Sequence, residues 1–203
     1  MTFSYLPKII HMGFGFAVFL LWLFSAKAAF ALFLIYTLTV FVFRKRRISF
    51  RDDQLTTDGL IYSPISGKVE SIREADGALE IKLHARPWQE MGIHMPLTGE
   101  VREVQREKNI VDKASNLPGR VSQLQFEGKA HTLIKIVFDN SVIGSRPQVM
   151  IAPGDRARRQ VNIGYMPFGG KLSMILPKES ELMIKIGDDV SAAETVLASL
   201  NKD

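Results

Sequence analysis

The sequence predicts a mainly β domain preceded by an N-terminal transmembrane helical hairpin, and three observations support this fold class. Residues 9–43 are apolar, with only His11 and Lys27 as ionisable side chains. From residue 51 onward, apolar and polar residues alternate in short segments, the pattern of half-buried strands. Turn-forming residues separate these segments. The predicted domains are a membrane anchor over residues 1–50 and a β domain over residues 51–203.

The anchor is best explained as two short helices. A single helix over residues 9–43 would be about 52 Å long, whereas the hydrocarbon core of a bilayer is about 30 Å thick. Lys27 lies near the middle, where a charge is costly inside the bilayer but tolerated at its surface. We therefore expect helices over about 9–25 and 29–43 that turn near Lys27, as two short spans or as a re-entrant hairpin.

Two other interpretations of this segment are less favoured than the two-helix hairpin. One tilted helix with Lys27 reaching the surface remains an alternative. A cleaved signal peptide is disfavoured, because the apolar run is too long and no small-residue cleavage site precedes the β domain.

The net charge of +5 is concentrated beside the anchor. Residues 1–50 contain basic side chains and no acidic ones, while acidic residues outnumber basic residues by one in the remainder. The basic run at residues 44–47 places that end of the anchor, and so the β domain, on the cytoplasmic face of the inner membrane. There it would contact anionic phospholipid headgroups. A general nucleic-acid partner is not expected, since such proteins carry a basic face on the domain itself.

Cysteine is absent, which excludes disulfides, thiol nucleophiles and cysteine-based metal sites. No metal site is predicted.

The β domain contains many short strands rather than strands that alternate with helices. Such a pattern favours a sandwich or closed barrel over a parallel α/β sheet. Turn signals occur at 76–77, 127–128, 153–155 and 187–189. The predicted strands cover residues 67–72, 78–83, 99–104, 121–126, 131–138, 171–176 and 182–186.

One motif occurs twice. Residues 64–69 and 96–101 both have the pattern Pro-x-(Ser/Thr)-Gly-x-Val, a turn that leads into a strand. Near the end of the chain, residues 185–198 read as a strand, a turn and a strand. Such short hairpins are typical of lipoyl-like barrel-sandwich folds, which is the architecture we predict.

Several motifs occur in the order in which one family has them. Residues 63–69 resemble Ser-Pro-Ala-Asp-Gly-Lys-Val, and residues 163–171, after Gly154-Asp155 and before 175–177, resemble Gly-x-Ile-x-Phe-Gly-Ser-Arg followed by Tyr-Leu-Pro. Residues 43–47, 112–115 and 187–198 match further stretches. The chain therefore resembles the short, membrane-anchored phosphatidylserine decarboxylases over nearly its whole length.

That resemblance implies a cofactor that this chain cannot make. The family converts a serine, cleaved from its preceding glycine, into a pyruvoyl group that forms a Schiff base with the substrate amine. The equivalent pair here is Gly169 and Gly170, and a glycine at 170 has no hydroxyl for the acyl shift. Ser173 is the nearest hydroxyl, but strand alternation places it on the opposite face. No pyruvoyl cofactor is expected.

The resemblance also assigns two supporting positions. Ser66 stands where the family has an aspartate that orients a histidine during self-cleavage. Residues 93–96 resemble the Val-His-Met-Pro of longer members, which makes His94 the self-processing histidine; the alternative is a hydrogen-bonded structural histidine. A second family histidine falls at Met91.

Two weaker patterns lie elsewhere. Residues 112–114 resemble the lipoyl-attachment tripeptide, but they occur in a long loop and not at a hairpin tip, so lipoylation is not expected. Trp88, Phe168 and Met166 either line a lipid-facing pocket or take part in ordinary packing at its rim.

Three functions follow from these observations. The first is a catalytically inactive decarboxylase homologue that binds membrane phospholipid or regulates a genuine decarboxylase. The second is an active enzyme that converts phosphatidylserine to phosphatidylethanolamine. The third is a non-enzymatic, membrane-anchored β-barrel adaptor. The partners expected are phospholipid and either a second copy of the chain or an active decarboxylase.

Overall fold

The computed structural model describes residues 4–5, 8–42, 44, 59–75, 77–107, 120–128, 131–139 and 147–200. The chain divides into two units, Met1–Arg46 and Arg47–Asp203, which are described separately. The basic run beyond Arg44 and the residues 112–115 lie outside the described ranges.

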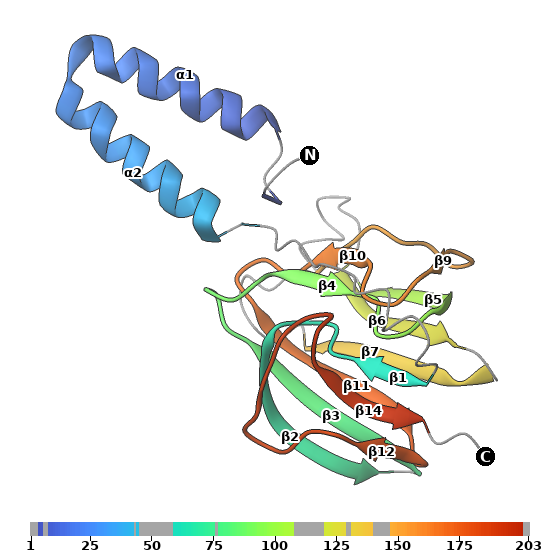
Figure 1. The fold of residues 1–203 in the computed structure, drawn as a ribbon. Coiled ribbons are helices and arrows are strands. Elements are labelled where there is room, and N and C mark those ends of the chain that lie inside the picture. The colour runs from blue at the N-terminus through green and yellow to red at the C-terminus, as the bar shows by residue number, and fades with distance from the viewer. Residues whose placement is uncertain are drawn as a thin grey trace. The chain divides into compact units, whose positions relative to one another are not determined.

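The first unit is a hairpin of two helices, α1 (Lys8–Phe24) and α2 (Ala26–Val42) (Figure 1). The predicted two-helix hairpin is confirmed, but the turn falls at Ser25 and not near Lys27, which lies in the first turn of α2. The reason is local, because the Ser25 hydroxyl accepts a hydrogen bond from the Ala28 amide at 3.4 Å. Serine is a favoured residue at a helix N-cap, whereas lysine has no acceptor to offer there.

The described helices do not support the transmembrane character predicted for this hairpin. Each has 17 residues, which gives a length of about 26 Å against a hydrocarbon core of about 30 Å. Among the described residues, none of the helices combines the length and the apolar character needed to cross a bilayer.

Polar contacts join the two helices at their open end. The ring of His11 lies between Ser4 Oγ, at 2.9 Å, and Tyr36 Oη, at 2.8 Å. The ring of Phe14 packs against Tyr36 with 5.3 Å between centroids. The pairing of α1 with α2 therefore rests on a hydrogen-bonded histidine as well as on apolar contact.

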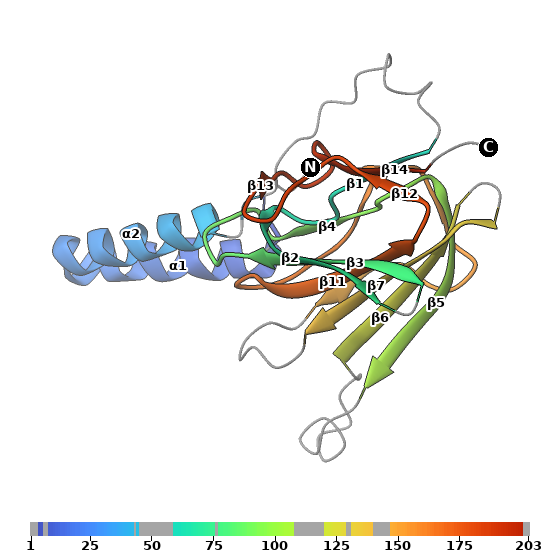
Figure 2. The same cartoon turned by 90° about the horizontal axis from the view of Figure 1, so that it is seen from below.

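The second unit is mainly β, as predicted, and contains one large and two small sheets (Figures 1 and 2). The large antiparallel sheet has the order β13-β2-β3-β11-β7-β6-β5-β9, and the small sheets have the orders β1-β14-β12 and β4-β10-β8. The strands are β1 (Leu60–Tyr62), β2 (Gly67–Ala75), β3 (Ala78–Ala85), β4 (Gly92–His94), β5 (Gly99–Glu107), β6 (Arg120–Glu127), β7 (Leu133–Asp139), β8 (Gln148–Val149), β9 (Arg156–Ala157), β10 (Asn162–Tyr165), β11 (Gly170–Pro177), β12 (Ser180–Leu182), β13 (Asp189–Val190) and β14 (Val196–Leu200).

These sheets repeat an arrangement about a pseudo-two-fold axis between β11 and β7. The order of the large sheet reads the same from both edges, with β2 equivalent to β5, β3 to β6 and β13 to β9. The two small sheets are equivalent to each other. The repeated sequence motif thus marks an internal duplication of structure: it leads into β2 in one half and into β5 in the other.

The two halves exchange hydrogen bonds at the start of each motif. The Tyr62 amide donates to Pro96 O at 2.9 Å, and the His94 amide donates to Pro64 O at 2.8 Å. Four further hydrogen bonds of the first half have an equivalent in the second. In the first half they are Val69 N to Asp188 O, Gly187 N to Val69 O, Ser63 N to Thr195 O and Lys185 N to Asp188 Oδ2. Their equivalents, in the same order, are Val101 N to Asp155 O, Gly154 N to Val101 O, Met95 N to Val161 O and Ala152 N to Asp155 Oδ2.

The glycines of the two motifs, Gly67 and Gly99, are required because the backbone of a neighbouring strand lies very close to each of them. A Cβ on Gly67 would lie 2.6 Å from His84 O, and a Cβ on Gly99 would meet Glu127 O more closely still. Cβ atoms do not approach backbone oxygens within 3.0 Å. Each half can therefore bring its long strand across its neighbour only because glycine occupies this position.

The core lies between the large sheet and the two small ones. It is filled by alternate residues of the long strands, among them Phe126, Ile136 and Met174, all fully buried. Of the predicted strands, 182–186 is wrong, because β12 ends at Leu182. The carboxylate of Asp188 accepts a hydrogen bond from the Lys185 amide at 2.8 Å and stabilises a turn where a strand was expected.

Candidate functional site

The residues singled out from the sequence meet at one end of the large sheet. In the ladder, Gly170 pairs with Ala85 of β3, and Gly67 packs against the backbone of His84 and Ala85 from the other side. Neighbouring strands are about 4.8 Å apart. Ser66 and the Gly169-Gly170 pair therefore flank the end of β3 from opposite sides.

Ser66 is 8% exposed and its hydroxyl is already engaged. The Oγ atom accepts a hydrogen bond from the Ala192 amide at 2.9 Å. In the other half the equivalent Thr98 Oγ1 accepts from the Arg159 amide at 3.1 Å. The role of the Ser66 side chain in this structure is to hold the turn that follows β13.

His94 is the last residue of β4 and only 2% of its surface is exposed. Its amide bond to Pro64 O ties it to the segment that carries Ser66. Burial lowers the pKa of His94 from 6.5 to about 4, partly opposed by the backbone carbonyls of Pro64 and Gly92. The imidazole is consequently neutral at pH 7.

Two polar side chains beside His94 were not identified from the sequence. Glu90 Oε1 lies 3.9 Å from His94 Nε2, and the Glu90 side chain is only 7% exposed. The Nδ2 atom of Asn162, on β10, lies 3.5 Å from the same ring nitrogen. Glu90 follows a Pro-Trp-Gln stretch that reads as a surface loop. No periodicity reveals its burial, although a glutamate four residues before a candidate histidine was the available signal.

The turn before β11 is unusual in its backbone. Phe168, Gly169 and Gly170 have φ values of +59°, +74° and +141°. The Gly169 amide closes the turn onto Met166 O at 3.3 Å, and a Cβ on Gly169 would collide with Ala85 O. Glycine suits both positions for conformational reasons, whereas a positive φ is rare for a bulky residue such as Phe168.

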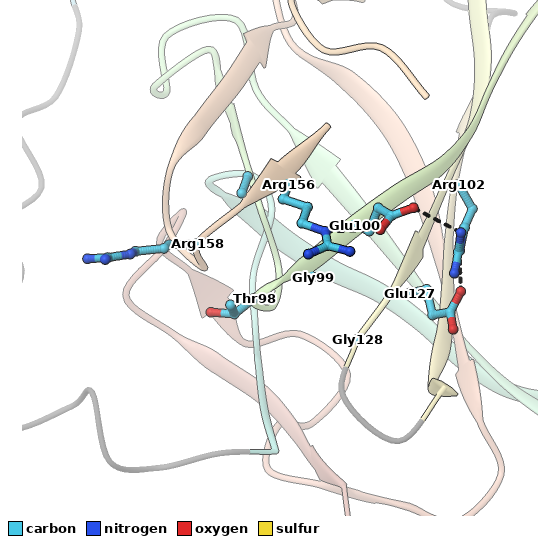
Figure 3. Close-up of a pocket in the computed structure, with 9 residues that line it drawn as sticks. Thr98, Gly99, Glu100, Arg102, Glu127, Gly128, Arg156 and Arg158 are labelled. Carbon is cyan, nitrogen blue, oxygen red and sulfur yellow. Dashed lines mark hydrogen bonds and ion pairs between the residues drawn. The ribbon is translucent and has the colours of Figure 1, made fainter. Parts of the chain in front are cut away.

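A surface hollow of about 540 Å³ lies in the other half of the domain (Figure 3). It surrounds Thr98 and Gly99, the counterparts of Ser66 and Gly67, and contains none of the residues singled out from the sequence. Arg102 bridges Glu100 and Glu127, and Arg156 contacts Glu100 at 3.1 Å. These carboxylates pair with Arg102 and Arg156, and Arg158 is a further cation in the lining of the hollow.

The described residues contain no cluster of three or more histidine, cysteine, aspartate or glutamate side chains that could hold a metal ion.

Comparison with known proteins gives one consistent result. No family model matches the chain. A phosphatidylserine decarboxylase proenzyme of Saccharopolyspora erythraea is 26% identical over 160 residues, which cover 71% of this chain and 67% of that protein. Proenzymes of the same description from Burkholderia mallei and Mycolicibacterium vanbaalenii are each 25% identical, over 156 and 162 residues. They cover 71% of this chain and 72% and 68% of their own lengths.

The chain is a distant homologue of phosphatidylserine decarboxylase proenzymes. This agrees with the family suggested by the order of the sequence motifs. Ser66, His94 and the Gly169-Gly170 pair, which that resemblance selected, lie at the same end of the sheet.

The buried state of His94 predicts a pH dependence of stability. In the unfolded chain His94 takes up a proton near pH 6.5, whereas in the folded chain its pKa is about 4. The free energy of unfolding is therefore highest above pH 6.5 and decreases as the pH falls from 6.5 to 4. The decrease in the free energy of unfolding is on the order of 3 kcal/mol. Urea unfolding in detergent micelles at pH 7.5 and 4.5 should show it, and His94→Gln should abolish most of it. As a control, His84→Gln should retain the wild-type loss; equal losses in all three proteins would contradict the assignment.

The crowding at Gly169 predicts a second difference in stability. Gly77 has nearly the same φ, +73°, but nothing within 4 Å of a Cβ. Gly77→Ala should therefore cost only the conformational term, about 1 kcal/mol. Gly169→Ala adds a backbone collision and should cost about 3 kcal/mol or more. Equal midpoints of urea unfolding for the two variants would show that the turn does not pack against Ala85 as described.

Proposed function

We propose that this chain is a membrane-bound, catalytically inactive relative of the phosphatidylserine decarboxylases that binds phospholipid headgroups. The carrying observation is the residue at position 170. Glycine stands there at the start of β11, where the family resemblance requires the serine that becomes the pyruvoyl group.

The missing hydroxyl removes the first chemical step. Formation of the pyruvoyl group requires the serine oxygen to attack the preceding carbonyl carbon, so that an ester replaces the peptide bond. Gly170 supplies no such oxygen. Ser173 cannot substitute, because burial alternates along β11 with Gly170 on the buried face and Ser173 on the other.

The surroundings support the same proposal. Ser66 carries no negative charge to orient a histidine, and its hydroxyl is used by the Ala192 amide. These residues form a packed, hydrogen-bonded end of the sheet, a suitable scaffold for recognition rather than for self-cleavage.

The helical hairpin supports attachment to a membrane. Large apolar side chains are exposed on both helices, among them Phe16, Phe24, Phe30 and Leu38, at 64%, 87%, 63% and 64%. A helix that is apolar all round is stable only within a protein core or a membrane. We propose that the hairpin enters one leaflet as a re-entrant anchor, with the basic run that begins at Arg44 on the cytoplasmic side.

The β domain supports a lipoyl-like barrel-sandwich assignment. Two equivalent halves, each led by a Pro-x-(Ser/Thr)-Gly-x-Val turn, share one continuous sheet. In this proposal the duplicated scaffold is retained and one of its two ends recognises phospholipid.

Headgroup binding can be tested with soluble glycerophosphoserine. Calorimetric titration of the full-length protein in zwitterionic micelles should give saturable binding. Ser66→Asp should weaken it by roughly tenfold, because the added carboxylate repels the phosphate. Thr98→Asp, at the equivalent position of the other half, is the matched control and should leave binding unchanged. Equal weakening by both variants, or no saturable binding, would contradict the proposal.

The same protein distinguishes the inactive from the active homologue. Incubated with phosphatidylserine in vesicles, it should form no phosphatidylethanolamine, since no electrophilic carbonyl is present to draw electrons from the carboxylate. Formation of phosphatidylethanolamine by the purified chain would favour the active decarboxylase instead.

A further inference from the structure

Two loops join at the candidate end of the sheet to make one surface. The first, residues 86–91, connects β3 to β4, and the second, residues 166–169, connects β10 to β11. The Met166 amide donates to Met91 O at 2.7 Å, and the backbone of Gly169 lies against Ala85 and Arg86. The backbones of the two loops are therefore in contact.

The exposed part of this surface, called here the aromatic rim, consists of Arg86, Pro87, Trp88 and Phe168. Trp88 is 66% exposed and Phe168 is 52% exposed. Aromatic side chains of this size usually supply buried area in a folded domain. Two of them exposed on loops whose backbones are in contact therefore indicate a surface for a partner.

The backbone holds Phe168 outward at some cost. Its φ of +59° is rare for a bulky residue. The ring of Pro167 fixes the preceding φ, and the Gly169 amide closes the turn onto Met166 O. The turn thus holds an aromatic residue where glycine would be the usual choice, which sets the position of the ring at the rim.

The chemistry of the rim fits the interface of a phospholipid bilayer. Tryptophan favours the headgroup level of a membrane, where its apolar body and its N–H both find suitable surroundings. The Arg86 guanidinium lies 5.9 Å from the centroid of the Trp88 ring and adds a phosphate-binding cation. The segments 84–91 and 166–171 contain Arg86 and Lys171, and their one acidic residue, Glu90, has a side chain that is only 7% exposed. Lys171 is held by Glu70 at 2.6 Å, so Arg86 is the cation that acts at the rim.

The equivalent position in the other half of the domain has a different character. There the ends of β6 and β7 carry Glu127, His131 and Leu133, and Glu127 contacts both His131 and Arg102. Leu133 and Asp139 are at opposite ends of β7, and Asp139 pairs with Lys171 at the candidate end. Leu133 is therefore about 20 Å from that end. The described residues of this second end offer charged pairs and one aliphatic side chain, so the aromatic character is confined to the candidate end.

We propose that the aromatic rim docks the β domain onto the surface of a bilayer that contains anionic phospholipid. The proposal rests on the proposed function only in taking phospholipid as the partner. It adds that the domain meets the membrane in one orientation, with the Ser66 and Gly169 end toward the headgroups. An anchor that merely tethered the domain would leave both ends equally exposed to water.

Trp88 can report its own insertion. The chain has two tryptophans, so Trp22→Phe leaves Trp88 as the single fluorophore. In the full-length protein reconstituted in vesicles of phosphatidylcholine and phosphatidylglycerol, Trp88 emission should shift to the blue. Lipids brominated near the headgroup should quench it by at least twofold. The matched control carries Leu133→Trp with Trp22→Phe and Trp88→Phe, and its reporter should remain accessible to aqueous acrylamide and unquenched by lipid. Equal accessibility of the two reporters would overturn the proposal.

A charge reversal separates docking from headgroup recognition. Arg86→Glu should at least halve the lipid quenching of Trp88 in anionic vesicles and leave the weaker quenching in pure phosphatidylcholine unchanged. If Arg86→Glu has no effect in anionic vesicles, the charge-assisted docking is refuted. Saturable glycerophosphoserine binding with an unquenched Trp88 would refute docking alone. A quenched Trp88 without glycerophosphoserine binding would leave docking intact and refute headgroup recognition.

Discussion

The β domain depends on a pair of reciprocal hydrogen bonds at its centre. The amides of Tyr62 and His94 donate to the carbonyls of Pro96 and Pro64, so that each half of the domain fixes the start of the other half's long strand. The crossing leaves no room for a side chain at Gly67. The surrounding sheets, with their palindromic strand order, follow from this junction because each half can bury its apolar face only against the other.

Because the junction between the two halves is symmetric, differences between the two ends of the domain show where the halves have diverged. At one end Thr98 and Gly99 border an open hollow in which Arg102 and Arg156 contact Glu100 and Glu127. At the other end the equivalent residues, Ser66 and Gly67, lie beside a turn with three successive positive φ angles. The turn at residues 168–170, the buried His94 and the exposed Trp88 and Phe168 all occur at the end of the domain that contains Ser66. Function is therefore best sought there, where the two halves have diverged.

Much of this architecture could be predicted from sequence, and the exceptions have physical causes. Period-two alternation identified the long strands, and the repeated Pro-x-(Ser/Thr)-Gly-x-Val turn marked both halves, because close packing leaves a local signature in glycine and proline. The break between the two helices falls two residues before the expected Lys27, and the strand expected over 182–186 stops at Leu182, since each boundary depends on a single side-chain cap. The burial of Glu90 beside His94 could not be inferred, because it results from contacts between loops distant in sequence. The two helices are shorter than the apolar run of residues 9–43 from which they were predicted, because Ser25 divides it.

Position 170 offers no side-chain oxygen with which the backbone could cleave itself, and the inactive assignment depends on this. Intact-mass measurement of the full-length protein, purified from cells that produce it, tests this most directly. We predict one uncut chain of 22.8 kDa, apart from processing at its N-terminus. Two polypeptides, divided between Gly169 and Gly170 or elsewhere in the β domain, with a carbonyl-blocked new N-terminus, would contradict the claim.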